Sequence, residues 1–189
     1  MAAHMNGNEL VVWRSAAGHL SAWPDRCPHR GMRLSHGFVR GETLACIYHG
    51  WVYETSGVCQ HIPAHPALVP PAAIRVEALS CVEKDGVLWL SAADTQTSPP
   101  ALTGLSPVRS LTATVGADRL RAVEPALTGA DILRGTVQIK DQPAEVCLLL
   151  QPRGTEVTIH ALCDETADRV AVSRWLDDLR RRAELGVAA

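Results

Sequence analysis

The sequence lacks several features that would place the protein in common classes. No apolar run approaches the roughly 20 residues that a membrane-spanning helix needs, and the first residues show no charged-then-apolar signal pattern. The net charge is −2, from 18 basic and 20 acidic residues, so no basic field would attract nucleic acid or an anionic membrane. We therefore expect a cytoplasmic protein with no membrane partner and no nucleic-acid partner.

A disulfide framework is also absent. Four of the six cysteines are scattered without regular spacing: Cys59, Cys81, Cys147 and Cys163. Buried reduced thiols that pack as small hydrophobic groups explain these four better than structural bridges do. The other two cysteines, Cys27 and Cys46, are each followed by a histidine two or three residues later.

The strongest chemical signal is a pair of short segments, Cys27-Pro28-His29-Arg30-Gly31 and Cys46-Ile47-Tyr48-His49-Gly50-Trp51. Each segment supplies one thiolate and one imidazole. Two sulfur and two nitrogen ligands suit either a tetrahedral zinc ion or a [2Fe–2S] cluster of the Rieske kind, in which two cysteines hold one iron and two histidines hold the other. Zinc fingers of the familiar kind place both cysteines before both histidines. One of each per segment favours a two-iron cluster held between two loops.

These segments resemble the Rieske domain of Rieske non-haem iron oxygenases. The similarity covers residues 27–37, 46–53, 57, 61–64 and 86–89. It implies a Rieske [2Fe–2S] cluster ligated by Cys27, His29, Cys46 and His49. Ile47 replaces the proline that is usual in the family, a conservative change that leaves the ligands in place. A Rieske protein of the cytochrome complexes would carry two further cysteines where Met32 and Tyr48 stand here, so the oxygenase type fits better.

Five residues beside the ligands are expected to support the cluster: Arg30, Gly31, Tyr48, Gly50 and Trp51. The two glycines permit tight loops whose amides approach the sulfides. Trp51 and Tyr53 are expected to shield the cluster from water, and Tyr48 either donates a hydrogen bond near a ligand or simply packs. By resemblance, Arg30 either braces its loop through Asp25 or Glu54 or is exposed at the surface.

Hydrophobic periodicity predicts a mainly β fold. Strands are expected in the first half at 9–14, 20–23, 43–45, 51–54, 58–60, 74–82 and 86–90. Short strands with glycine-rich turns favour an antiparallel β-sandwich. In the second half strands are expected at 108–115, 119–123, 132–139, 146–151 and 156–162. A terminal helix follows, with one apolar face made of Val172, Trp175, Leu176, Leu179 and Ala183.

Composition divides the chain into two expected domains. Residues 91–105 lose periodicity and gather Ser, Thr, Pro and Ala. We expect a Rieske [2Fe–2S] domain over residues 1–93, a linker over 94–106, and a small α+β domain of antiparallel strands plus a terminal helix over 107–189. The last resembles, weakly, a shortened oxygenase catalytic domain.

The second half lacks the histidines of a mononuclear iron site. Catalytic domains of the resembled family carry an Asp-x-x-His-x-x-x-x-His element and a later carboxylate, which bind iron as a facial triad. Seven of the eight histidines lie at or before His65, and only His160 follows the expected linker. We therefore assign no catalytic residue, and expect His160 to be a polar strand residue. His61 and His65 do not suit a new metal pair, because Pro63 and Pro66 prevent the helix that would align them.

These features lead to a functional hypothesis with two alternatives. The leading hypothesis is an iron–sulfur oxidoreductase that transfers single electrons to or from a redox partner protein, either a reductase or an oxygenase component. One alternative is a shortened subunit of a hydroxylase or demethylase, dioxygenase-like in type, whose substrate iron is supplied elsewhere. The other is a ligand- or partner-binding module with a structural cluster. The resemblance also implies a possible homo-oligomer, since trimeric rings are common among such oxygenases.

Overall fold

A computed structural model describes residues 1–92 and 98–186. The chain divides into two compact units, Met1–Lys84 with Leu88–Pro99 and Asp85–Val87 with Pro100–Ala189. Residues 93–97, which include the start of the expected linker, lie outside the described residues. The expected linker ran to residue 106, but a strand already begins at Leu105. No helix in the described parts of the chain is long and apolar enough to span a membrane.

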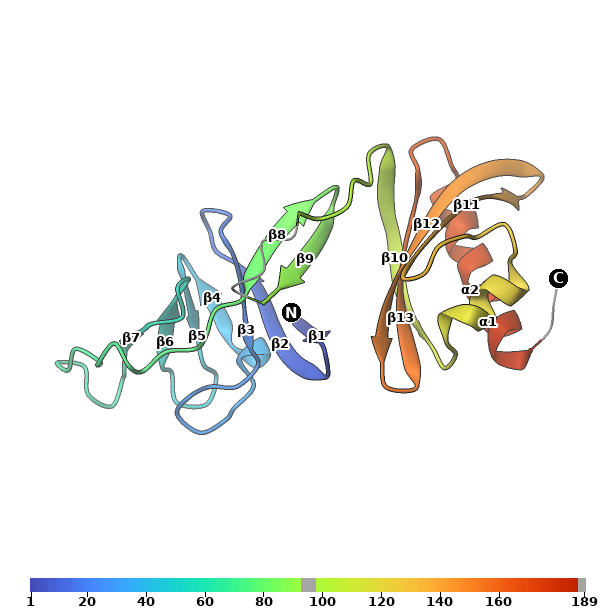
Figure 1. The fold of residues 1–189 in the computed structure, drawn as a ribbon. Helices are drawn as coiled ribbons and strands as arrows, with labels where there is room; N and C mark the ends of the chain where they lie inside the picture. Colours follow the sequence, from blue (N-terminus) through green and yellow to red (C-terminus); the bar gives the residue numbers. More distant parts are fainter. Residues whose placement is uncertain (93–97, 187–189) are drawn as a thin grey trace. The chain divides into compact units, whose positions relative to one another are not determined.

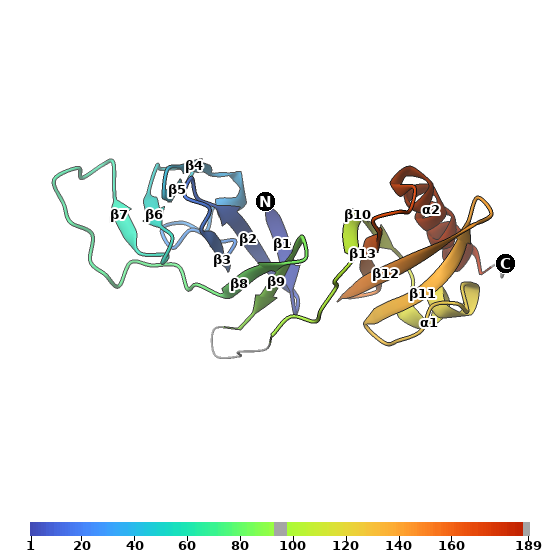
Figure 2. The same cartoon turned by 90° about the horizontal axis from the view of Figure 1, so that it is seen from above.

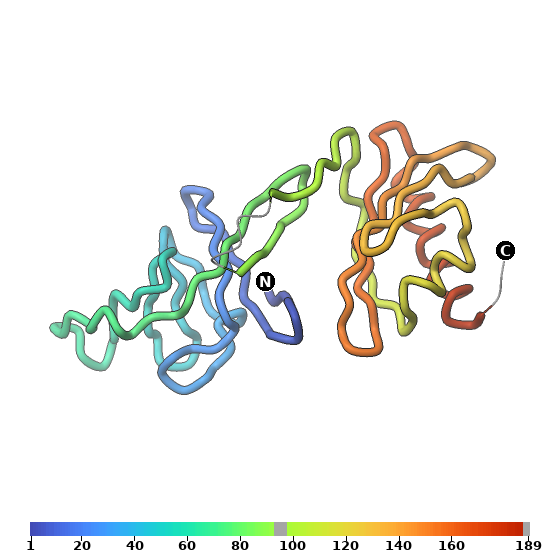
Figure 3. The backbone as a smooth tube through the Cα atoms, in the orientation of Figure 1, coloured from blue at the N-terminus to red at the C-terminus, as the bar shows by residue number. Residues whose placement is uncertain are grey.

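The first unit is built from short strands (Figures 1 and 3). Its sheets have the orders β1-β2-β3, β4-β5-β6-β7 and β8-β9, and a 3₁₀ turn, η1, covers Leu34–His36. The first two sheets are antiparallel throughout. The strands are β1 Ala2–Met5, β2 Asn8–Arg14, β3 Leu20–Pro24, β4 Phe38–Arg40, β5 Thr43–Ala45, β6 Val52–Glu54, β7 Cys59–His61, β8 Ser80–Lys84 and β9 Val87–Ser91. This is the antiparallel, mainly β architecture that the sequence predicts, although β1 and β4 were not predicted.

The predicted strand at 74–82 is wrong over its first six residues. Only Ser80–Lys84 forms a strand, because the preceding segment bonds to two different sheets in turn. The Val76 amide donates to Gly57 O and the Leu79 amide donates to Ala22 O. Val76 is buried in the core, which explains the apolar pattern of this segment without a partner strand.

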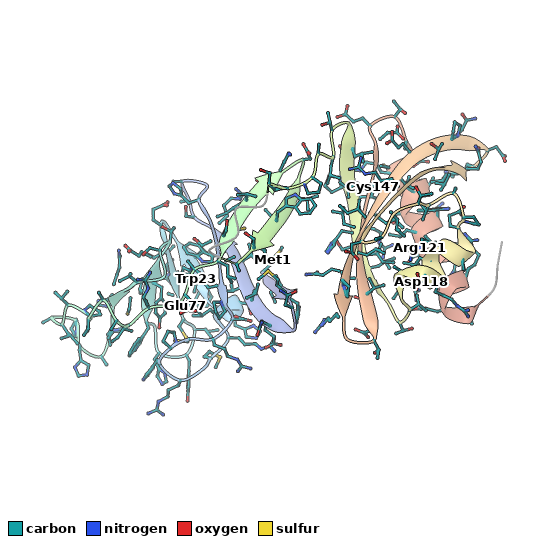
Figure 4. All side chains as sticks on the ribbon, viewed as in Figure 1. Met1, Trp23, Glu77, Asp118, Arg121 and Cys147 are labelled. Carbon is teal, nitrogen blue, oxygen red and sulfur yellow. The ribbon has the colours of Figure 1, made fainter. Side chains whose placement is uncertain are left out.

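A single core fills the first unit and includes both motif cysteines. Trp23, fully buried in the middle of this unit (Figure 4), meets Trp13 edge-on at 5.1 Å between ring centroids and Tyr53 at 6.3 Å. Such edge-to-face pairs are the preferred contacts of aromatic rings. The ligand segments are therefore anchored in the most rigidly packed part of this unit.

The second unit is one four-stranded antiparallel sheet with the order β10-β13-β12-β11 and two helices (Figures 1 and 2). Alternate strand residues and the apolar residues of both helices form its core. Asp168 caps the second helix by accepting hydrogen bonds from the Val170 and Ala171 amides, and Gly186 ends it in the left-handed conformation. The elements are β10 Leu105–Ala113, α1 Ala117–Val123, β11 Ile132–Ile139, β12 Gln142–Arg153, β13 Glu156–Asp164 and α2 Arg169–Leu185.

The terminal helix is confirmed and one strand of this half is wrong. Val172, Leu176, Leu179 and Ala183 are fully buried, as the apolar face predicts. Residues 119–123, expected as a strand, belong to helix α1. In a run of five residues a period of two and a period of three to four are hard to distinguish. The buried side chains, Leu120 and Val123, are three apart and follow the helical period.

Candidate metal centre

Two loops of the first unit carry the predicted ligands, and their backbones close in the same way. In the loop after β3, the Cys27 amide donates to Met32 O at 2.8 Å and the Gly31 amide donates to Cys27 O at 2.8 Å. In the loop between β5 and β6, the Cys46 amide donates to the carbonyl of Trp51, five residues on, at 2.9 Å, and the amide four residues on donates to Cys46 O at 3.0 Å.

A glycine with a positive φ completes each of these loops. Gly31 and Gly50 both have φ of 70° and stand four residues after their cysteines. This backbone conformation is open to glycine at no steric cost. The two loops therefore share one turn, although the histidine follows the cysteine by two residues in the first and by three in the second.

The loops bring the four predicted ligands together as two pairs. Cys27 and Cys46 are each 3% exposed, whereas His29 is half-buried and His49 is exposed. The two imidazole centroids are 4.6 Å apart. Throughout residues 1–92 and 98–186, no three His, Cys, Asp or Glu side chains gather as they would around a single ion. The arrangement is instead a pair of thiols inside and a pair of imidazoles outside, which is the ligand pattern of a Rieske cluster.

The electrostatics of the thiol pair fit a bound cationic centre. Burial raises the pKa of the Cys46 thiol, and the adjacent Cys27 raises it further, while the amides of Tyr48 and His49 donate to its sulfur and partly oppose the shift. Two buried thiolates side by side would be costly without a positive charge between them. Metal ions supply that charge and hold cysteine as thiolate.

The surroundings of His29 favour its neutral form. Desolvation, followed by the nearby charges of His49 and Arg30, lowers the pKa of His29. A neutral imidazole is the form that binds a metal. Residues Cys27, His29, Cys46 and His49 would thus hold a [2Fe–2S] cluster, the two cysteines from the buried side and the two histidines from the side nearer solvent.

Aromatic rings support both imidazoles. Trp51 stacks on His29 with the centroids 4.4 Å apart and the planes within 6°. Tyr48 lies against His49 at 3.8 Å with a tilt of 34°. Together with the contact between the two imidazoles, this makes a row of four rings in the order Trp51, His29, His49, Tyr48. Tyr48, at one end of the row, is 55% exposed.

Tyr53 contacts a ligand sulfur in a way that the sequence analysis missed. Its hydroxyl lies 3.1 Å from Cys27 Sγ, and its side chain is fully buried. Burial first, and then the hydrogen bond to Cys27, raises the pKa of Tyr53. The phenol therefore stays protonated, and its hydroxyl donates a hydrogen bond to the sulfur. The alternation of β6, which buries only its central residue, is the sequence signal that points Tyr53 inward.

Arg30 is exposed, and the carboxylates expected to pair with it have other partners. Buried Asp25 accepts hydrogen bonds from the Ser35 amide and hydroxyl, both at 2.7 Å. Glu54 accepts from Ser56 and Gln60. Of the two alternatives for Arg30, the structure shows the exposed one.

A different arginine braces the first ligand loop. Arg26 donates to Gly31 O at 3.3 Å, and Glu9 lies between the guanidinium groups of Arg26 and Arg33. Glu9 lies on β2, well before the ligand motif in the sequence, so the motif alone does not indicate that it is involved. This explains why the sequence analysis did not identify the brace.

A third loop closes over the second ligand loop. A Cβ added at Gly50 would come within 3.0 Å of Pro63 Cγ. The His61–Ala64 run, part of the resemblance, therefore packs directly on the Cys46 loop. His61 is half-buried at the end of β7 and His65 is exposed, and neither belongs to a group of three metal-binding side chains in the described residues.

His160 lies within β13 of the second unit, as predicted for a polar strand residue. Its Nδ1 is 2.7 Å from Ser110 Oγ, and its Nε2 is 3.5 Å from Gln151 Oε1. Desolvation lowers the pKa of His160. Cys59, Cys81, Cys147 and Cys163 form no disulfide, as their scattered spacing predicts.

The sequence comparisons place the first part of the chain in a known family. The Rieske [2Fe-2S] domain model matches residues 1–81. The chain is 46% identical over 88 residues to the oxidoreductase NdmD of Pseudomonas putida, covering 46% of this chain and 15% of NdmD. It is 41% identical over 83 residues to the methylxanthine N1-demethylase NdmA of the same species, covering 44% of this chain and 24% of NdmA. The chain thus spans a quarter or less of these two relatives.

The structural comparisons extend over both units. NdmA of Pseudomonas putida CBB5 matches with a TM-score of 0.77 at 20% identity, covering 99% of this chain and 74% of NdmA. Dicamba monooxygenase without ligand matches with a TM-score of 0.76 at 16% identity, covering 99% and 80%. At these identities the likeness shows the fold. The family match, the sequence relatives and the paired thiols and imidazoles agree: residues 1–81 form a Rieske [2Fe–2S] domain, similar to those of the oxidoreductase NdmD and the demethylase NdmA.

Proposed function

We propose that the protein transfers single electrons through a Rieske cluster held by Cys27, His29, Cys46 and His49. A cluster of this type takes up and releases one electron at a potential between roughly −150 and +300 mV. The observation that carries the proposal is the asymmetry of the site, with thiols 3% exposed and an imidazole pair at the surface. This arrangement leaves the histidine side open to a partner protein.

The surrounding residues tune and protect that chemistry. The Tyr53 hydroxyl donates to Cys27 Sγ, and the amides of Tyr48 and His49 donate to Cys46. Donors to ligand sulfurs favour the more negative, reduced state and so raise the potential. Trp51, stacked on His29, excludes water from one face of that imidazole.

Metal and sulfide analysis of the purified protein tests this function. We expect red-brown protein with iron and acid-labile sulfide in equal amounts and a rhombic electron paramagnetic resonance signal after reduction. The His49→Ala variant is expected to lose the iron. Colourless protein that contains zinc and no acid-labile sulfide would overturn the proposal.

The fold of the whole chain favours a second candidate function. The match to NdmA covers 99% of this chain and includes the sheet-and-helix unit. A further relative, 37% identical over 92 residues, is described as a putative iron-sulfur subunit of a toluene-4-sulfonate monooxygenase system in Comamonas testosteroni, and the match covers 49% of this chain and 26% of that protein. The candidate function is an oxygenase component whose substrate iron is supplied outside the described residues. Iron in excess of sulfide, together with substrate-dependent oxygen uptake, would support it over an electron carrier.

A further inference from the structure

Three neighbouring loops of the first unit, which we call the loop face, carry cations and no carboxylates. They comprise residues 26–36, 46–51 and 62–73, and they contain Arg26, Arg30 and Arg33 but neither aspartate nor glutamate. The chain as a whole has more acidic than basic residues, 20 against 18. The loops adjoin one another, since His29 meets His49 across the first two and Gly50 meets Pro63 across the second and third.

Large apolar side chains are exposed on the same loops. Ile47 is 48% exposed, Tyr48 55%, Leu68 49% and Val69 87%. Adjacent exposed apolar groups, such as Ile47 beside Tyr48, mark interaction sites more often than single ones do. Two of these side chains, Ile47 and Tyr48, directly precede the proposed ligand His49 in the sequence.

The three arginines of the loop face differ in their ion-pair partners. Arg26 and Arg33 share Glu9, which neutralises part of their charge. Arg30 is exposed and directly follows His29 in the first ligand loop. The net charge presented beside the imidazole pair is therefore positive and is centred on Arg30.

We propose that the loop face docks an acidic electron-transfer protein, whose carboxylates meet Arg30 and whose apolar centre covers Ile47 and Tyr48. The proposal rests on the electron-transfer function above and names the chemistry of the partner. Complementary charge guides encounter, while apolar contact at the centre stabilises the complex. A nucleic acid fits less well, because three arginines, two of them shared with Glu9, neutralise few phosphates.

The first experiment measures binding of a carboxylate polymer and needs no electron transfer. Poly-L-glutamate is titrated into the full-length protein by calorimetry at low and high salt. We expect binding that weakens as salt increases, and a dissociation constant about fivefold higher for Arg30→Glu, as expected for reversing one charge within a Debye length. The matched control is Arg75→Glu, because Arg75 is exposed but contacts Ser56 O in the turn at the far end of β6 from Trp51.

The second experiment measures electron transfer with small ions of opposite charge. The reduced protein gives one electron to hexacyanoferrate(III), which becomes hexacyanoferrate(II), and the rate is followed by stopped flow. We expect Arg30→Glu to slow this reaction about fivefold at low salt and Arg75→Glu to change it much less. With cationic hexaamminecobalt(III), Arg30→Glu is expected to accelerate the reaction instead.

These experiments separate the docking surface from the function on which it rests. Equal effects of Arg30→Glu and Arg75→Glu, or tighter binding of poly-L-lysine than of poly-L-glutamate, would overturn the docking proposal. A protein that holds no reducible cluster would overturn the electron-transfer function, and poly-L-glutamate binding would still report on the loop face.

Discussion

The two units differ in what keeps their backbones in place. In the second unit, long antiparallel ladders, such as the eight paired residues of β11 and β12, pack one face against two helices. In the first unit the ladders are mostly three to five residues long, and the core includes the two motif cysteines. The second unit thus combines long hydrogen-bonded ladders with a large apolar core, whereas the first has shorter ladders and includes the two motif cysteines in its core. From this contrast we expect metal binding to matter for the stability of the first unit and not for that of the second.

The largest expected effect breaks the first unit and spares the second. Cys46→Ser removes a buried thiolate ligand, so we expect near-complete loss of bound iron and of visible absorbance, because each ligand is needed to hold the cluster. Amide hydrogen exchange is expected to rise across residues 26–62 and to stay low in β12 and β13. Cys81→Ser, at a half-buried thiol on β8, is the control and should keep its iron. Full iron content in Cys46→Ser would contradict the ligand assignment.

The next effect breaks the second unit and spares the first. Leu176 is fully buried on α2, and Leu176→Ala leaves a cavity that costs about 2–5 kcal/mol of unfolding free energy. Chemical denaturation followed by helical circular dichroism measures this loss. Exposed Arg174→Ala on the same helix should change stability by no more than about 0.5 kcal/mol. Loss of iron in Leu176→Ala would show that the two units are not stabilised separately.

A smaller effect separates backbone strain from contact within the ligand loops. Gly31→Ala and Gly50→Ala each place a side chain at φ of 70°, which costs about 1 kcal/mol or more. Only Gly50→Ala also brings a Cβ against Pro63, because the space beside Gly31 is open. We expect Gly50→Ala to lose at least about 1 kcal/mol more than Gly31→Ala, since overpacking adds to the strain. Urea unfolding of the iron-loaded protein, monitored by visible absorbance, measures both; equal losses would mean that Pro63 moves aside freely.

The smallest effect leaves both units folded and changes only the redox balance. Tyr53→Phe removes the hydroxyl that donates to Cys27 Sγ. Losing about 1 kcal/mol of preference for the reduced state corresponds to a potential about 40 mV lower. A redox titration followed by circular dichroism measures it. Tyr48→Phe keeps the ring against His49 and should shift the potential less. An equal shift in the two variants would contradict the claim that the Tyr53 hydroxyl raises the reduction potential.

Local patterns predicted the parts of this structure whose cause is local. The ligand segments were recognised from residue types and spacing, and β11 has the predicted bounds because its apolar alternation runs over eight residues. The terminal helix was predicted because apolar residues recur at helical spacing from Val172 to Ala183. Helix α1 was missed because five residues of alternating arginine and apolar character fit two periods equally.

Other features depend on contacts between distant residues, which no local pattern contains. The extended segment before β8 satisfies its amides with Gly57 and Ala22, far away in the sequence. Strand β1 forms because it pairs with β2 from Ala2↔Val11 to Met5↔Asn8, and its own composition is not strand-like. The brace of the first ligand loop by Glu9 and Arg26 is of the same kind. The four residues proposed as ligands could thus be named from the sequence, whereas most of the contacts that support their loops could not.

Backbone hydrogen bonds from the amides of each cysteine and glycine close the two ligand loops, so the exposed side chains of Arg30 and Ile47 are not needed to maintain either turn. Arg30 and Ile47 can therefore be exchanged for residues of other charge and size while the two turns keep their backbone conformation. Within stretches of only six residues each, the residues proposed to bind iron are therefore distinct from the residues proposed to bind a partner protein.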